Sequence, residues 1–536
     1  MARENRARVW WCAAASGAVL AASIAAAPAA RAQDVRIEPQ LSEPRSIDLQ
    51  TAPEIPPMAR PAGLVTNRPT MPMADYVAAK KAASAHQMPA PAKPGATAPP
   101  AASDVTLYTQ VAGPNEAQTS GGNRFPPDGD IATSVEWMLQ VSNDQVVMYN
   151  WNTNAFKQVN LNTLFANSNF LYFAPRVIHD PYWDRFLVVA AGCVICSGSI
   201  TGSGFFIAVS QTGDPSGGWW QWNAVYSSGL FVDFPQLGMD IDAIIVTDNL
   251  FVYNQYAGPQ LFTFDKAHLY NGIAQGMTVG YFGGGSCTMA PPYVLDPNPA
   301  AYVLSYCPGD TQVNIGSLTN SSRSNVHYNL SDNTVSVGFH GLPSDAQQPG
   351  TTYTLDTGDN RFENRSLQVG SRIINTATIN DVNLPTPAFY TFDIGAIPHT
   401  LVGEREFFAA FHSNDWHPSI VANTVGATPN TPLGEIFVTW MSTDPTNNVN
   451  LQLRASGGLG DDPSIGSGIA VFTSPLPLTN QTDASGIHRS GDYTSVTTYP
   501  AAALGCQADE VGILTGEVAA ATAGLWSTRV GIVKHC

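Results

Sequence analysis

One phrase recurs along the chain, and its spacing constrains the fold more than any other feature. A short proline-led stretch, apolar at alternate positions and often carrying Asp, leads into a β-branched run, as in PPDGDIATSVEWMLQV. The copies begin near Pro126, Ala174, Phe234, Pro291, His417 and, in a degenerate form, Asp492. Each copy predicts two strands joined by a turn, and most copies lie roughly 50–75 residues apart, the period of a propeller blade with long loops.

The gap between Pro291 and His417 is about twice the usual spacing and holds a weaker copy, Ser366 to Ala377. We therefore predict an all-β fold, a single β-propeller of seven blades, with six as the alternative. A pair of β-sandwiches is the main rival, but sandwiches do not repeat one phrase at this period. The last strand, around Trp526, and a strand near Val105 are expected to complete one blade and close the ring.

The N-terminus is typical of an export signal. Arg3, Arg6 and Arg8 precede the apolar run Val9 to Ala27, and Ala30-Arg31-Ala32 fits the small-x-small cleavage rule. We expect residues 1–32 to be a signal peptide and the mature chain to begin near Gln33. The protein would then be secreted or periplasmic, without a membrane span after cleavage. An uncleaved anchor helix is the alternative, because the apolar stretch is a little long.

The next segment, residues 33–103, is rich in Pro and Ala and poor in aromatic residues. Such a composition buries too little surface to order itself, so we expect a flexible, disordered segment that folding does not need. Met73 to His86 could instead form a short helix. The propeller domain is predicted to span residues 104–536.

The surface is predicted to be polar but weakly charged. Charged residues make up 12% of the chain, the net charge is −17, and the positions after the first hundred include few lysines. Nucleic acids and anionic membranes need a basic face, so neither is expected as a partner. We expect a monomer whose partner is a glycan or an extracellular protein.

Six cysteines remain after the predicted signal peptide. An even number in an exported chain indicates disulfides, and proximity favours three local pairs, although fifteen pairings are formally possible. The favoured pairs are Cys193–Cys196, Cys287–Cys307 and Cys506–Cys536. Cys193-Val-Ile-Cys196 could be a redox motif, but no helix is predicted there to lower a thiol pKa. A zinc site would need a second CxxC or clustered His, so no metal and no cofactor are expected.

Ligands of propellers bind at the mouth of the central channel. If the recurring phrase marks an inner strand, the polar residues at the start of each copy converge at this mouth. The candidate ligand-binding residues are Asp128, Arg176, Asp233, Asp415 and Arg489, and the candidate catalytic residues are Asp492, Tyr493 and His417. The alternative is that these residues cap blade turns, since Asp before a strand often bonds turn amides.

Two kinds of sugar chemistry are compatible with these residue types. A glycoside hydrolase needs two carboxylates, which Asp128, Asp233 and Asp492 could supply. A polysaccharide lyase needs a His or Tyr base and an Arg for the uronate, available in His417, Tyr493 and Arg489. No serine-hydrolase elbow, zinc-protease motif or phosphate-binding glycine loop occurs.

Three further features have a functional and a structural interpretation. Trp219-Trp220-Gln221-Trp222 could stack on sugars or pack between blades. His179-Asp180 could be a catalytic pair or part of a turn. Asp240 and Asp242 could hold Ca²⁺, but two carboxylates are too few to support a site.

The phrases PRVIHDPYWDRFLVVA, DFPQLGMDIDAIIVTDN, LDTGDNRF and RSGDYTSV resemble a family of secreted bacterial β-propeller proteins, mostly without assigned activity. That family is loosely similar to the sialidase and BNR-repeat propellers. The resemblance covers Pro126 to Cys536 and implies fold and export rather than a reaction.

A sialidase would need three arginines, a Tyr–Glu nucleophile pair and an acidic Asp. Candidates exist in Arg176, Arg361, Arg489, Arg529, Tyr493, Glu517 and Asp128, but the Phe-Arg-Ile-Pro signature and a clean Asp box are missing. We therefore expect an extracellular binding module. A carbohydrate-active enzyme, either a hydrolase or a lyase, is the alternative.

Overall fold

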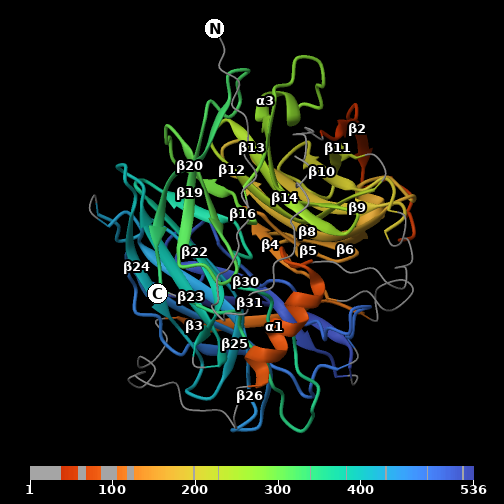
Figure 1. The fold of residues 1–536 in the computed structure, drawn as a ribbon. Helices are drawn as coiled ribbons and strands as arrows, with labels where there is room; N and C mark the ends of the chain where they lie inside the picture. The colour runs from red at the N-terminus through yellow and green to blue at the C-terminus, as the bar shows by residue number, and fades with distance from the viewer. Residues whose placement is uncertain are drawn as a thin grey trace, which may run out of the picture.

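The chain folds into a β-propeller, a ring of antiparallel sheets that Figure 1 shows from red at the N-terminus to blue at the C-terminus. The computed structural model describes residues 38–57, 68–85, 105–116, 126–196, 200–226, 229–285, 287–338, 340–381, 383–428, 431–479, 481–521 and 524–536. Among the described residues, the three helices are short and everything else that is regular is strand. The prediction of an all-β propeller is confirmed.

Four of the sheets contain four antiparallel strands each. The first comprises β4 (Asp130–Thr133), β5 (Trp137–Ser142), β6 (Gln145–Asn150) and β7 (Phe156–Asn160). The second comprises β16 (Met289–Ala290), β18 (Ala301–Tyr306), β19 (Gln312–Thr319) and β20 (His327–Ser336). The third comprises β25 (Asn414–Ala422), β26 (Glu435–Asp444), β27 (Val449–Leu459) and β28 (Ile469–Thr473). The fourth comprises β29 (Ser495–Thr498), β30 (Val511–Ala519), β31 (Trp526–Lys534) and β3 (Thr106–Asn115).

Two sheets are larger. One contains β8 (Leu171–Asp180), β9 (Arg185–Cys193), β10 (Gly204–Ser210) and β11 (Gly218–Val225), extended by β1 (Gln40–Leu41) and β2 (Arg45–Asp48). The other begins with β12 (Leu230–Met239), β13 (Ala243–Val252), β14 (Gln255–Asp265) and β15 (Val279–Gly283). It continues through β17 (Pro292–Val294) to β21 (Ser366–Val369), β22 (Arg372–Asp381), β23 (Leu384–Asp393) and β24 (Thr400–Glu406). The described strands form six sheets, in which five blades are distinguished. The expected count of seven blades is therefore not confirmed.

The recurring phrase corresponds to the first strand of a sheet and the strand that follows it. Ala174, Phe234 and His417 each have a positive φ, between 49° and 54°, and each precedes a proline. The ladder slips at all three positions, in β8, β12 and β25. A proline has no N–H to donate, so it is tolerated in a strand at such a bulge. The phrase is therefore the sequence signature of a bulged inner strand.

These first strands contact one another around the ring axis. β4 contacts β8, β8 contacts β12, and β12 contacts β17, which pairs with β21. β21 contacts β25, β25 contacts β29, and β29 contacts β4. The succession returns to its first member, so the starts of these strands meet around one axis.

The two ends of the propeller region meet in one sheet, as expected. β3, from the N-terminal side, pairs antiparallel with the last strand β31. The Cys506–Cys536 disulfide joins the loop before β30 to the end of the chain. Disulfides also join Cys193–Cys196 and Cys287–Cys307, so the three predicted pairs are confirmed.

The region between residues 33 and 103 differs from the expected flexible segment wherever the structure describes it. β1 and β2 pair with β11 and extend that sheet at its edge. α1 (Met73–Ala85), the orange helix at the front in Figure 1, packs on the propeller through Tyr76 and Lys80. The helical alternative for Met73 to His86 was therefore the correct one for Met73–Ala85. The predicted signal peptide lies outside the described residues.

Two further helices are single turns. In α2 (Leu161–Leu164) and α3 (Lys266–Leu269), Asn160 and Asp265 cap the first turn with their side chains. The core consists of clusters between neighbouring sheets. Trp222 packs with Phe205 and Phe262, whereas Trp219 belongs to the next cluster around the ring. Both indoles are fully buried, which supports the packing interpretation of these tryptophans.

Candidate functional site

Seven of the eight candidate residues lie together around the ring axis, at the bulges of the inner strands or in the stretches that lead into these strands. We call this region the channel mouth. It comprises Asp128, Arg176, Asp233, Glu363, His417, Arg489, Asp492 and Tyr493. Each of these residues is at most 4% exposed. Asp415 is the candidate outside the region: it accepts hydrogen bonds from Ala409 N and Trp440 Nε1 within its own part of the ring.

Arg176 binds groups from several parts of the ring. Its guanidinium donates to the carbonyl oxygens of Pro235 and Glu363 and to Oδ1 of Asn364, at 3.3, 2.6 and 2.9 Å. It also lies 3.2 Å from the ring centroid of Tyr493. The Tyr493 hydroxyl donates to the Pro175 carbonyl at 3.0 Å. These contacts favour a structural tie at the axis, because each donor already has a partner within the protein.

His417 and Glu363 form a buried pair. Nδ1 of His417 lies 2.8 Å from Oε1 of Glu363, and burial raises the pKa of Glu363. Nε2 of His417 and Oε2 of Glu363 are buried without a hydrogen-bond partner in the described structure. His417 has a positive φ and lies in the β25 bulge. Sequence reasoning missed Glu363, although it directly follows the quoted phrase LDTGDNRF.

Three carboxyl groups gather near Arg489. Asp492 pairs with Arg489, and Asn143 Nδ2 donates to Asp128 Oδ2 at 2.6 Å. Burial, followed by the nearby Asp492 carboxylate, raises the pKa of Asp128 well above its ordinary value. Burial, followed by Asp128, does the same to the pKa of Glu517. Both shifts have the same physical cause, because an ionised carboxylate is costly to bury.

The N-terminal segment covers this end of the channel. Arg68 N donates to Oδ2 of Asp233 at 2.8 Å, and the Arg68 guanidinium lies 4.0 Å from the ring centroid of Phe231. Arg361 donates to the Arg68 carbonyl and pairs with Asp359. Further along the segment, Lys80 contacts the loop that precedes β21. In the described structure, the channel mouth is thus closed by the chain itself.

The opposite end of the channel holds a small cavity of about 50 Å³. Its lining includes Thr133, His179, Tyr293, Ser419 and Thr497, from five different inner strands, and Arg365, which directly precedes β21. Arg365 pairs with Asp130 there at 3.0 Å. A volume of this size suits one or a few water molecules rather than a sugar.

The residues of the other predicted sites are used in turns. Asp180 accepts from the Tyr182 amide and pairs with Lys266 at 2.7 Å, while His179 pairs with Asp184. Asp240 accepts from the amides of Asp242 and Ala243. A hollow of about 220 Å³ lies beside these turns and includes Trp183, Asp242 and His268.

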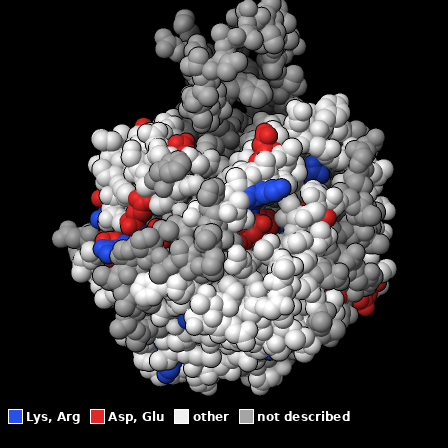
Figure 2. All heavy atoms as spheres, turned by 60° about the horizontal axis from the view of Figure 1, so that its bottom comes forward, with Lys and Arg blue, Asp and Glu red and all other residues white. Residues whose placement is uncertain are grey.

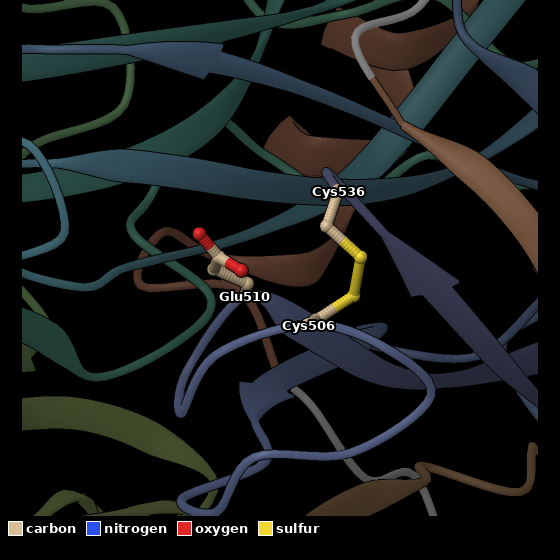
Figure 3. Close-up of side chains that lie close together, drawn as sticks. All are labelled: Cys506, Glu510 and Cys536. Atoms are coloured by element: carbon tan, nitrogen blue, oxygen red, sulfur yellow. A yellow bond between two sulfur atoms is a disulfide. The ribbon is translucent and has the colours of Figure 1, made fainter.

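Cys506, Glu510 and Cys536 are the one grouping of potential metal ligands among the described residues (Figure 3). Both sulfur atoms belong to a disulfide, and the Glu510 carboxylate accepts from the amide of Gln507 at 2.7 Å. A disulfide offers no thiolate, so this grouping does not form a metal centre.

Figure 2 shows one face of the molecule, on which uncharged atoms prevail among those described and charged side chains lie singly or in small groups. This distribution agrees with the low charged content of the sequence. Among the described residues, no helix has the length and apolar character needed to cross a membrane.

Comparison with known proteins returns structures but no sequence relative. No protein-family model and no curated protein sequence matches this chain. The N-terminal domain of Nup159 is 10% identical, with a TM-score of 0.35, and the match covers 80% of this chain and 95% of that one. A Trypanosoma rangeli sialidase mutant with trans-sialidase activity is 13% identical, with a TM-score of 0.33, and covers 68% of this chain.

The match spans about half, 54%, of that sialidase chain. A GH43 β-1,3-galactosidase is 9% identical, with a TM-score of 0.28, and the match covers 69% of this chain and 74% of that one. At these identities and TM-scores the likenesses assign neither a substrate nor a partner to this chain.

Proposed function

We propose that this protein is an exported β-propeller that binds a glycan or an extracellular protein at the channel mouth without transforming it. The observation that carries the proposal is the commitment of the candidate catalytic groups to partners within the protein. The Tyr493 hydroxyl is bonded to a backbone carbonyl, Asp492 is paired with Arg489, and His417 is paired with Glu363. A general base needs to reach a substrate proton, directly or through one water, and these side chains are at most 2% exposed.

A carbohydrate-active enzyme is the second candidate, and one observation favours it. Asp128 and Glu517 are carboxyl groups whose pKa is raised well above the ordinary value by burial, as a glycosidase acid requires. For this function, the N-terminal segment and the contacts of Arg176 and Gly358 beneath it would both have to move before a sugar could contact these carboxyl groups. Binding requires only the first of these movements.

The export part of the proposal is supported by the three disulfides, since such bonds persist in oxidising compartments. Within it we place the chain among secreted bacterial propellers and expect a mature monomer that begins near Gln33. We also propose seven blades. The nine-stranded sheet divides into two four-stranded runs, β12–β15 and β21–β24, that meet at the parallel strand β17.

The proposal is tested with the mature protein on a glycan array, on a panel of extracellular proteins and in polysaccharide digests. Binding without new reducing or unsaturated ends supports the binding module, whereas product formation refutes it. Asp233→Asn, at the channel mouth, should weaken binding roughly 5- to 150-fold, which corresponds to about 1–3 kcal/mol for an unpaired buried partner. Trp183→Ala, at the other end of β8, is the control and should leave binding unchanged.

A further inference from the structure

The ammonium group of Lys80 lies in a pocket built by the loop between β20 and β21. The residue is 4% exposed, and its ammonium group makes hydrogen bonds to neutral acceptors and ion pairs with carboxylates. The hydrogen-bond acceptors are Pro343 O, Thr357 Oγ1 and Gly358 O, at 2.9, 2.9 and 3.0 Å. The ion-pair partners are Asp345 Oδ1 and Asp356 Oδ1, both at 3.2 Å.

This set of acceptors is specific for a primary ammonium. Two backbone carbonyls and a hydroxyl take up the N–H groups, and two carboxylates balance the charge, so the group is both hydrogen-bonded and neutralised. Burial alone would lower the pKa of Lys80, but Asp356 and Asp345 outweigh it and raise the pKa above its ordinary value. A quaternary ammonium, which has no N–H, would leave the carbonyls unpaired.

α1 enters this pocket with one narrow face. Tyr76 and Lys80 are the two buried residues of the helix. They are four positions apart and therefore lie on the same side of it. The Tyr76 hydroxyl donates to Asp356 Oδ1 at 2.8 Å. Val77, on another side of the helix, is 41% exposed. Ser84 Oγ accepts from the Asp345 amide at 3.1 Å, so the helix is held by polar side chains rather than by an apolar stripe.

The pocket is continuous with the channel mouth. The Asp356 amide donates to the carbonyl oxygen of His488. The Asp356 carbonyl oxygen accepts from the hydroxyl of Ser490, which lies two residues before Asp492. A Cβ added to Gly358 would lie 3.0 Å from Glu363 Oε1 and 3.3 Å from His417 Cε1. The residue that accepts from Lys80 therefore packs directly on the His417–Glu363 pair.

We propose that the Lys80 pocket is a binding site for a primary ammonium group, occupied in cis by α1, and that its external ligand is a polypeptide helix with Tyr and Lys four residues apart. The inference rests on the proposed binding function and names the ligand class of the pocket that adjoins the channel mouth. A polypeptide is favoured because the occupant seen in the structure is itself a helix that uses both side chains. A tethered occupant has a high effective concentration, so an external ligand must compete with α1.

The first test is chemical rescue in the full-length mature protein. Lys80→Ala should lower the melting temperature by about 3–5 °C, because it removes the cationic partner of Asp345 and Asp356. Millimolar n-butylammonium should restore most of this loss, and tetramethylammonium should restore none. Lys81→Ala, the exposed neighbour on the same helix, should show neither loss nor rescue. Failure of n-butylammonium to raise the melting temperature of Lys80→Ala would overturn the ammonium site.

The second test uses the synthetic peptide MADYVAAKKAASA, which corresponds to Met73–Ala85. It should bind Lys80→Met, a variant that keeps an unbranched side chain of similar length, at least tenfold more tightly than it binds the wild type. A peptide with Ala at the position of Lys80 should not bind. Equal binding of both peptides, or binding of a de-N-acetylated chitin oligomer in place of the peptide, would overturn the polypeptide assignment. If no natural partner is found but amine rescue succeeds, the proposed function fails and the ammonium pocket stands.

Discussion

Tyr493→Phe separates a structural from a catalytic role at the channel mouth. The substitution removes one hydroxyl and keeps the ring on which the Arg176 guanidinium lies. The Pro175 carbonyl, which accepts from that hydroxyl at 3.0 Å, loses this partner in a region closed to water. The expected cost is the free energy of leaving a buried acceptor unpaired, about 1–3 kcal/mol.

This cost converts into a small but measurable change in melting temperature. Unfolding entropy is about 2.1 cal/mol/K per residue, so the roughly 430 residues from Val105 to Cys536 give about 0.9 kcal/mol/K. Tyr493→Phe should therefore lower the melting temperature by about 1–3 °C if the propeller unfolds as one unit. Differential scanning calorimetry measures this directly.

The chain offers a matched control. The Tyr499 hydroxyl donates to the Val135 carbonyl at 2.7 Å at an exposed position, where water can replace it. Tyr499→Phe should leave the melting temperature unchanged. If both variants melt like the wild type, the bond to Pro175 does not support the fold. If Tyr493→Phe instead reduces turnover of a polysaccharide about a hundredfold without a change in melting, Tyr493 is catalytic and the binding proposal is wrong.

Three further outcomes are expected. Glu517→Gln should raise the melting temperature at pH 7 and flatten its fall as pH rises above the ordinary carboxyl range, because a carboxyl with a raised folded-state pKa gives stability at low pH that is lost as pH rises; the exposed Glu136→Gln should do neither. Replacing both Cys506 and Cys536 by Ser should cost about 3.6 kcal/mol in chemical denaturation, against about 1.6 kcal/mol for Cys193 and Cys196, since their separations are 30 and 3 residues; equal losses would contradict this loop-entropy account. Deleting residues 33–104 should lower the melting temperature, because β1, β2 and α1 are lost; unchanged melting would restore the flexible-segment interpretation.

The sequence predicted the propeller well because the fold depends on a repeated local device. Each bulged inner strand needs a residue that adopts positive φ followed by a proline, and that requirement leaves a visible phrase at Ala174, Phe234 and His417. The cysteine pairs were predictable for a related reason, since neighbours in the chain lie on neighbouring strands or in the same hairpin.

The docking of α1 was not predictable from composition. Hydrophobic patterning finds helices that bury an apolar stripe, but α1 buries one tyrosine and one lysine. Nothing in a Pro/Ala-rich segment distinguishes Lys80, which is buried, from Lys81, which is exposed. The partners Asp345 and Asp356 are more than 260 residues away in the chain, in a loop without strand periodicity.

The pairings within the candidate site could not be read from the sequence. Inner strands converge on the axis of a propeller, and seven of the eight candidates lie together there, but their role as a ligand site stays a prediction. Asp415 is the exception. It lies two residues before His417, and its carboxylate accepts hydrogen bonds from the Ser413 hydroxyl and the Trp440 indole N–H instead. Glu363 was missed because it precedes β21, the strand that carries the weaker copy of the phrase.

The layering of the channel mouth is the physical basis of the proposal that the protein binds a ligand there. The outer layer, α1, is held by the polar contacts of Tyr76 and Lys80, which a competing ligand of the same chemistry can reproduce. The inner layer is held by the ties of Arg176 to several parts of the ring and by the packing of Gly358 on His417, which no ligand reproduces. Exchange at the outer layer therefore leaves the propeller intact, whereas access to Asp492 and His417 requires the ring axis itself to be remodelled. This difference between the two layers is the reason for which we propose exchange of α1 for an external helix rather than catalysis at Asp492 and His417.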